Sequence, residues 1–215
     1  MLNEPNNTNR LGSLLVITAP SGAGKSTLVK RLRASLEEIA FSISYTTRPP
    51  RVGEEHGREY FFVSTSDFEK MQAADQFLEC AKVHSNYYGT HRTAVEQALE
   101  AGKDLILDID VQGAEQIKRA MPQAVLIFIM PPSFEALSER LRTRNLDATE
   151  VIERRLKEAS FEVARYLEFD YVIINDELEQ ATESLIAIAK AERLKPYRMG
   201  NKLKSILASF PQYLR

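Results

Sequence analysis

The sequence predicts an α/β fold in which a parallel sheet is covered by helices on both faces. Short apolar runs of strand length alternate with longer stretches of helical periodicity, an order typical of parallel sheets. The apolar runs hold few polar residues, as expected of strands buried on both faces. At 215 residues the chain suits one domain, which we expect over 11–215 after a flexible polar leader at 1–10.

In the first half of the chain, a strand is expected at 14–18 and a helix from about 26 to 38, on which Leu28, Leu32 and Leu36 share a face. Residues 41–63 mix β-branched and aromatic residues with prolines and glycines, which predicts short strands and turns. A helix near 68–74 is expected to be capped by Asp67, and another at 93–101 to end at Gly102.

The second half repeats the alternation more regularly. The expected elements are a strand at 105–110, a helical segment, a strand at 124–129, two arginine-rich helical stretches separated by 145–147, a buried strand at 171–174, a long helix at 179–195 and an amphipathic tail at 203–215. The segment from about 41 to 90 fits this alternation poorly. We therefore interpret it as an inserted lobe that holds a substrate.

Composition excludes several classes of partner. A net charge of −2 gives no general attraction to nucleic acid or anionic membranes, so any anion site must be a local cluster. No run approaches the roughly 18 apolar residues of a membrane helix. The single cysteine, Cys80, rules out a disulfide framework within the chain and suits a reducing compartment. We expect a cytoplasmic protein with no nucleic-acid or membrane partner; its oligomeric state is not readable from sequence.

Residues 19–26 form a phosphate-binding loop between the first strand and the first helix. They match the pattern G-x-x-x-x-G-K-[ST] except at the first position, which is Ala19. Glycines let backbone N–H groups face an anion, and the helix N-terminus favours a phosphate. Lys25 can reach the β- and γ-phosphates, and the Ser26 hydroxyl can ligate Mg²⁺. The motif predicts a P-loop NTPase-type sheet with Mg²⁺ as cofactor and this ATP-binding set: Ala19, Pro20, Ser21, Gly22, Ala23, Gly24, Lys25, Ser26 and Thr27.

Two aspartates, Asp108 and Asp110, end a central apolar run. Both are expected at the carboxyl end of a core strand, beside the phosphate loop and on the same side of the strand. A carboxylate there can hold Mg²⁺ or its waters, or bind a sugar, and the spacing does not decide which aspartate does so. Residues 110–113 also match the D-x-x-G of GTP switches, but the sole Asn-Lys pair, at 201–202, lacks the aspartate of a guanine-reading N-K-x-D motif.

Residues 44–54 carry two arginines on either side of two prolines. A polyproline-type backbone has three residues per turn, so Arg48 and Arg51 should project from the same side. Two guanidinium groups at fixed spacing suit a phosphate monoester, although the segment by itself could also be a surface turn. Further along, Arg140 and Arg144 share a helix face and Arg155 follows on the next helix; these also fit a solvated charged face.

Taken together, several segments resemble the guanylate kinase family, in order over roughly residues 11–195. The segments are 19–26, 44–54, Asn86-Tyr87-Tyr88-Gly89, Asp108-Ile109-Asp110 with Gln112-Gly113, Pro131-Pro132-Ser133 and Ile174-Asn175-Asp176. The resemblance implies a core, a GMP-binding lobe at about 41–90 and a helical lid at about 138–156. It also implies transfer of the γ-phosphoryl group of ATP to GMP, and to dGMP, with ATP and GMP as the partners.

The resemblance assigns roles residue by residue. The GMP set is Ser44, Glu79 and Thr90 for the base, Arg48, Arg51, Tyr60 and Tyr88 for the phosphate, and Asp108 and Asp110 near the ribose or metal. Asn175 would lie near the ATP base, and the catalytic set would be Lys25, Arg48, Arg140, Arg144 and Arg155. Two departures stand out: Ala19 in the loop, and Thr143-Arg144-Asn145 where the family usually has Gly-Arg-Gly.

Guanine presents donors at N1 and N2 and an acceptor at O6. With the roles implied by the resemblance, Glu79 would accept from both donors and Ser44 would donate to O6, so adenine would leave a buried carboxylate unpaired. Two alternatives stay open. One is a non-catalytic interaction module, which would characteristically lack the phosphate loop that is intact here at 24–26; the other is a kinase for another small phosphate acceptor.

Overall fold

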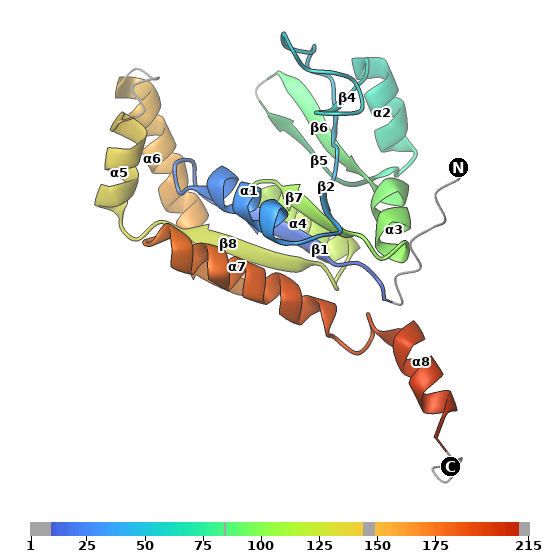
Figure 1. Ribbon diagram of the computed structural model, residues 1–215. Helices are drawn as coiled ribbons and strands as arrows, with labels where there is room; N and C mark the ends of the chain where they lie inside the picture. The colour runs from blue at the N-terminus through green and yellow to red at the C-terminus, as the bar shows by residue number, and fades with distance from the viewer. Residues whose placement is uncertain (1–9, 84, 144–148, 211–215) are drawn as a thin grey trace.

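The computed structural model describes residues 10–83, 85–143 and 149–210, which form a core sheet and a smaller second sheet (Figure 1). The core sheet has the order β2-β7-β1-β8-β9, and all its pairings are parallel. Its strands are β1 (Leu14–Thr18), β2 (Ile39–Phe41), β7 (Asp104–Asp108), β8 (Val125–Met130) and β9 (Tyr171–Ile174). The predicted parallel sheet is confirmed.

Helices cover both faces of the core sheet, as predicted. On one face, α1 (Lys25–Ser35) and α7 (Leu178–Arg193) pack against the side chains of Leu15 and Ile17. On the other, α3 (Arg92–Glu100) and α4 (Val111–Ala120) pack against Leu14 and Val16. Because side chains alternate along a strand, β1 is buried at every position, and its four apolar residues, 14–17, divide between the two faces.

The second sheet lies within residues 45–91 and has the order β4-β3-β6-β5. Its elements are β3 (Tyr45–Thr46), β4 (Phe61–Phe62), β5 (Phe77–Val83), β6 (Asn86–His91) and the covering helix α2 (Thr65–Ala73). Phe68 of α2 is fully buried, and its ring stacks on those of Phe77 and Tyr87, with centroids 4.5 and 5.4 Å away. These aromatic contacts give the lobe a core of its own.

Helices α5 (Phe134–Thr143) and α6 (Thr149–Ala164) pack on each other through a small separate apolar cluster. In Figure 1 this helix pair stands at the upper left of the core and the second sheet at its upper right. The remaining described elements are the short 3₁₀ helix η1 (Tyr166–Glu168) and α8 (Gly200–Ala208), which begins three residues before the predicted amphipathic tail at 203–215 and overlaps it. None of the described helices is both long and apolar enough to cross a bilayer.

Local predictions needed three corrections. Helix α1 ends at Ser35 and not near Glu38, because Leu36 is extended and Glu38 has a positive φ of 61°. Ser64, not Asp67, caps α2: its Oγ accepts from the Asp67 N–H at 3.0 Å. Strand β9 is an edge strand, so Val172 and Ile174 are exposed where a buried strand was expected.

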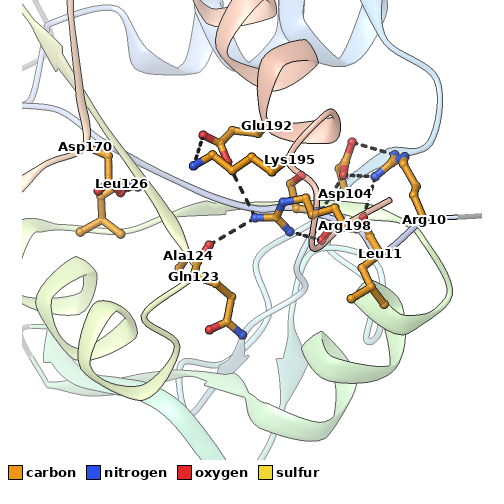
Figure 2. A network of polar contacts seen from close by, with 12 residues as sticks. Arg10, Leu11, Asp104, Gln123, Ala124, Leu126, Asp170, Glu192, Lys195 and Arg198 are labelled. Atoms are coloured by element: carbon orange, nitrogen blue, oxygen red, sulfur yellow. Dashed lines mark hydrogen bonds and ion pairs between the residues drawn. The ribbon is translucent and has the colours of Figure 1, made fainter. Parts of the chain in front are cut away.

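A polar network joins the start of the described chain to the segment after α7 (Figure 2). Asp104, which is buried, accepts hydrogen bonds from Arg10 at 2.9 Å and from Arg193 at 2.6 Å. Arg198, also buried, donates to the Gly12 carbonyl and to the Gln123 carbonyl, the latter at 3.2 Å. The network ties Arg10 and Arg198 to the amino-terminal ends of the core strands, opposite the phosphate loop.

Candidate active site

A cleft of about 610 Å³ lies where the phosphate loop, the second sheet and α6 converge. From the core it is lined by the loop and by Asp108, Ile109 and Asp110. From the lobe and from α6 it is lined by Ser44, Tyr60, Glu79, Ala81, Val83, Tyr88, Arg155, Glu158 and Glu162. Parts of the chain more than a hundred residues apart therefore face one another across a space of ligand size.

Two glycines shape the phosphate loop. Gly22 and Gly24 have φ values of +94° and +93°, a conformation that other residues rarely adopt. At Gly24 a Cβ would lie 2.3 Å from the amide nitrogen of Asn175, so the position is also sterically closed to side chains. Ala19 is not among the described residues with positive φ, so alanine in place of the usual glycine adds no backbone strain there.

Asn175 holds the loop from the end of β9. Its buried side-chain amide donates a 2.7 Å hydrogen bond to the Ala23 carbonyl. The backbone carbonyl of Asn175 accepts a 3.0 Å hydrogen bond from the guanidinium of Arg140 on α5. A second cavity of about 470 Å³, on the other side of the loop, is lined in part by Arg140, Asn175 and Thr27.

The two aspartates at the carboxyl end of β7 have different structural roles. Asp108 ends the strand, and its carboxylate forms an ion pair with Lys25. Asp110 lies beyond the strand, where it caps α4 by accepting from the Gly113 N–H at 2.8 Å. The prediction that both end the same strand was therefore wrong for Asp110, because its oxygen satisfies the open N–H groups of a new helix.

Glu79 is the buried carboxyl of the cleft, with only 5% of its surface exposed. Its Oε1 accepts a 2.7 Å hydrogen bond from the hydroxyl of Thr90, the facing residue on β6. Burial raises the pKa of Glu79 to about 7, against the lowering effect of the Thr90 hydrogen bond, and the charge of Asp110 raises it further. A ligand that donates hydrogen bonds to this carboxylate would favour its ionised form.

Arg48 is held in place by an acid from its own loop. Its guanidinium donates to Glu54 at 2.8 Å and lies 5.4 Å from the centre of the Tyr60 ring. The hydrogen bond to Glu54 raises the arginine's pKa, and Tyr88 adds to the effect. Glu54 also accepts from the backbone N–H of Arg51 at 2.7 Å, while the Arg51 side chain is exposed. The structure thus brings Arg48, Tyr60 and Tyr88 together but leaves Arg51 at the surface.

The predicted lid arginines approach the phosphate loop from two helices. Arg155 of α6 donates from Nε to the Ser21 hydroxyl at 3.1 Å. Arg140 reaches the loop indirectly, through Asn175. Arg144, and with it the departure at 143–145, lies outside the described residues except for Thr143.

Two acids that line the cleft, Glu158 and Glu162, were not predicted from the sequence. They lie three and seven residues after Arg155 on α6, a spacing that places all three on one face and was readable from the sequence. Burial raises the pKa of Glu162 to about 7. Lys25 opposes that rise, and Asp110 and Glu158 add to it. The cleft therefore holds more carboxyl groups than predicted, and burial favours the neutral form of one of them.

Comparisons with known proteins point to one family. The sequence model for the family described as guanylate kinase matches residues 12–192. The chain is 50% identical over 204 residues to the guanylate kinase of Thiobacillus denitrificans, covering 95% of this chain and 96% of that one. It is 48% identical over 200 residues to the guanylate kinase of Nitrosomonas europaea, covering 93% and 100%. The crystal structure of guanylate kinase from Anaplasma phagocytophilum matches with a TM-score of 0.71 at 35% identity, covering 93% and 95%.

Proposed function

The chain belongs to the guanylate kinase family, whose members use ATP to phosphorylate GMP, and we propose how the residues of the cleft carry out that transfer. The protein is a nucleotide-binding kinase with an α/β fold of the P-loop NTPase type. The roles below rest above all on one observation: a phosphate loop and a buried carboxyl, Glu79, line the same cleft.

ATP is bound by the phosphate loop, residues 19–27. Backbone N–H groups of the loop and the N-terminus of α1 face its phosphates, and Lys25 exchanges Asp108 for the β- and γ-phosphates. Asn175 serves ATP by fixing the loop, which deepens the role first expected for it beside the base. Arg140 and Arg155 neutralise the phosphates from α5 and α6, and Arg144 belongs to the same proposed set.

GMP is bound between the lobe and the end of β7. Arg48 and the hydroxyls of Tyr60 and Tyr88 hold its phosphate, and Glu54 keeps the Arg48 fork aimed at them. Arg51 joins this grip by swinging in from the surface, since Glu54 holds only its backbone. Asp108 and Asp110 lie beside the ribose, and dGMP, which lacks the 2′-hydroxyl, is a second acceptor.

Glu79 selects the base. Its buried carboxylate accepts from guanine N1 and N2, Ser44 donates to O6, and Thr90 orients the carboxylate from the facing strand. Adenine offers an acceptor where guanine offers the N1 donor, so it would leave the ionised Glu79 unpaired. Sites of this kind reject such analogues by factors of about 10⁴ or more.

The transfer itself requires alignment more than acid–base chemistry. The acceptor is an anionic phosphate oxygen, so no general base is needed. Lys25, Arg48, Arg140, Arg144 and Arg155 bring two anions together and neutralise the charge that develops between them. Closure of α5 and α6 over the cleft excludes water, which would otherwise take the phosphoryl group.

Mg²⁺ is the proposed cofactor, and the oxygen groups near the loop fit it. The described residues contain no group of three or more His, Cys, Asp or Glu side chains placed to hold a metal. Mg²⁺ does not need one, because it keeps several waters and binds substrate phosphates. Ser26 would ligate it, with Asp108 or Asp110 acting through water, and the bound ion would neutralise phosphate charge.

An acceptor panel tests this function. ATP, Mg²⁺ and purified protein are incubated with GMP, dGMP, AMP, CMP or UMP, and ADP formation is followed with a coupled assay. We expect rapid turnover with GMP and dGMP and almost none with the others. A preference for another monophosphate would change the proposed acceptor. If no monophosphate increased ADP formation, a non-catalytic binding module would be favoured.

We also propose a cytoplasmic enzyme without nucleic-acid or membrane partners, which cell fractionation would test.

A further inference from the structure

Gln116 of the core helix α4 makes a paired contact with the lobe. Its side-chain oxygen accepts a 3.2 Å hydrogen bond from the backbone N–H of Cys80, and its side-chain nitrogen donates at 3.3 Å to the Cys80 carbonyl. One amide group thus satisfies both backbone groups of a single residue on β5. A neighbouring strand would bond to that residue in the same way.

The position of β5 explains why such a contact is needed. In the order β4-β3-β6-β5 it is an edge strand, so one side of its backbone has no strand partner in the described sheet. On that side it faces α4 of the core, and Gln116 is half-buried. The side chain closes the edge of the lobe sheet and fixes it to the core at a defined register.

Cys80 directly follows Glu79, the residue that reads the base in the proposed function. Glu79 is attached to its own sheet through Thr90, which moves with the lobe. Helix α4 also passes close to the carboxylate, since a Cβ on Gly113 would lie 3.5 Å from Glu79 Oε2. Through its contact with Cys80, Gln116 therefore links the segment that carries Glu79 to α4, the helix capped by Asp110.

We propose that Gln116 is a positioning residue for guanine recognition, which fixes the Glu79 carboxylate relative to the core through the backbone of Cys80. The proposal rests on the proposed role of Glu79. Without the paired amide contact, β5 can shift along α4, and the carboxylate no longer meets guanine N1 and N2 with both oxygens. ATP, which binds on the phosphate loop, is unaffected.

The test compares Gln116→Met, which keeps the length of the side chain but makes neither hydrogen bond, with Gln97→Met, the same change at an exposed glutamine of α3. Gln116→Asn, which withdraws the amide by one methylene, serves as a second variant if the first folds poorly. Steady-state kinetics give KM and kcat for GMP, IMP and ATP. IMP lacks the N2 donor, so the ratio of kcat/KM for GMP to that for IMP reports on Glu79. Thermal melting followed by circular dichroism verifies the fold.

We expect Gln116→Met to raise the KM for GMP about tenfold and to lower the GMP/IMP ratio, with the KM for ATP within about twofold. Gln97→Met should leave all three unchanged. The same substitution is also made in Glu79→Gln, because the effects of two residues that act through one another do not add. In that background, Gln116→Met should lower kcat/KM for GMP by less than a further threefold.

The outcomes separate this proposal from the role of Glu79. An equal loss of GMP use in both backgrounds, or an equal rise of KM for GMP and ATP, would overturn the positioning role and leave a structural one. If Glu79→Gln alone impairs GMP use but Gln116→Met does not, the proposal fails and the role of Glu79 stands. If Glu79→Gln itself leaves the GMP/IMP ratio unchanged, the role of Glu79 fails and the proposal with it.

Discussion

The ammonium group of Lys25 is paired with the Asp108 carboxylate, across the gap between the phosphate loop and the end of β7. The side chain of Lys25 is 19% exposed and that of Asp108 37% exposed, so the pair lies at the surface of the cleft and not in the core. An arriving triphosphate can displace Asp108 without leaving a buried charge behind. The pair therefore keeps the lysine extended toward the place where phosphate binds.

Lys25→Ala should lower kcat by at least about 10³-fold and leave the fold intact, because the lost charge acts mainly on the transferring phosphoryl group. Steady-state kinetics with saturating GMP and ATP measure the effect. Lys30→Ala, at an exposed lysine of the same helix, is the matched control and should keep normal turnover. Turnover of Lys25→Ala near that of the control would remove the lysine from the mechanism.

Arg48→Met should raise the KM for GMP and lower kcat, together about 10²-fold in kcat/KM. The change removes a charge-assisted grip on the acceptor phosphate, and such a grip is worth roughly 1.5–3 kcal/mol. Arg58→Met is the control, since this arginine pairs with acids of its own surface loop. An equal fall in kcat/KM for the two variants would mean that the overall positive charge of the loop matters, and not the Arg48 guanidinium that Glu54 holds in place.

Asn175→Ala should weaken the binding of ATP more than the binding of GMP. The substitution leaves the Ala23 carbonyl without its 2.7 Å donor and frees the loop from β9, at a cost of about 1–3 kcal/mol. ATP binding measured by calorimetry should weaken about tenfold or more, while the KM for GMP stays within about twofold. Unchanged ATP affinity would show that the loop holds its shape without Asn175.

The stability of the ligand-free protein should fall as pH rises from about 4.5 to 7. The pKa of Glu162 is raised from 4.5 to about 7, so the folded protein binds more protons than the unfolded chain in that window. Glu79 acts with the same sign. Glu162→Gln should flatten the profile and add about 1–2 kcal/mol to the free energy of unfolding at pH 8, less than the whole pKa shift would give, because the side chain is partly exposed to solvent.

Urea unfolding at pH 5 and pH 8 measures this effect. Glu183→Gln, at an exposed acid of α7, removes the same unit of charge and should leave the slope as it is. A profile for Glu162→Gln that is as steep as that of the unaltered protein would show that Glu162 is not held neutral by its surroundings.

The core elements could be predicted because local pattern and tertiary environment agree there. Residues 14–17 are all apolar, and residues 14–18 form β1 as predicted, since both faces of the strand are covered. The predictions fail where the tertiary environment, and not the local pattern, determines which residues are buried. The run at 171–174 looks equally buried in sequence, but β9 lies at the sheet edge, which periodicity alone does not reveal.

Side-chain partners were harder to predict than the elements that carry them. Asp110 was expected on a strand, but its short carboxylate caps a helix, a competition that apolar periodicity does not register. The pairing of Gln116 with Cys80 joins residues 36 positions apart and has no sequence signal. Glu162 could have been found from its spacing to Arg155, whereas its raised pKa depends on its burial in the cleft, which only the tertiary structure shows.

The most direct test of this account is the kinetics of Glu79→Gln beside Glu69→Gln, the same change at an exposed acid of the lobe helix α2. In Glu79→Gln, an NH₂ group that can only donate replaces one of the two carboxylate oxygens that accept from guanine N1 and N2. We predict that kcat/KM for GMP falls by about 10² or more while the KM for ATP stays within about twofold, and that Glu69→Gln changes neither. A kcat/KM for GMP within twofold of the unaltered enzyme would contradict the assignment of the cleft.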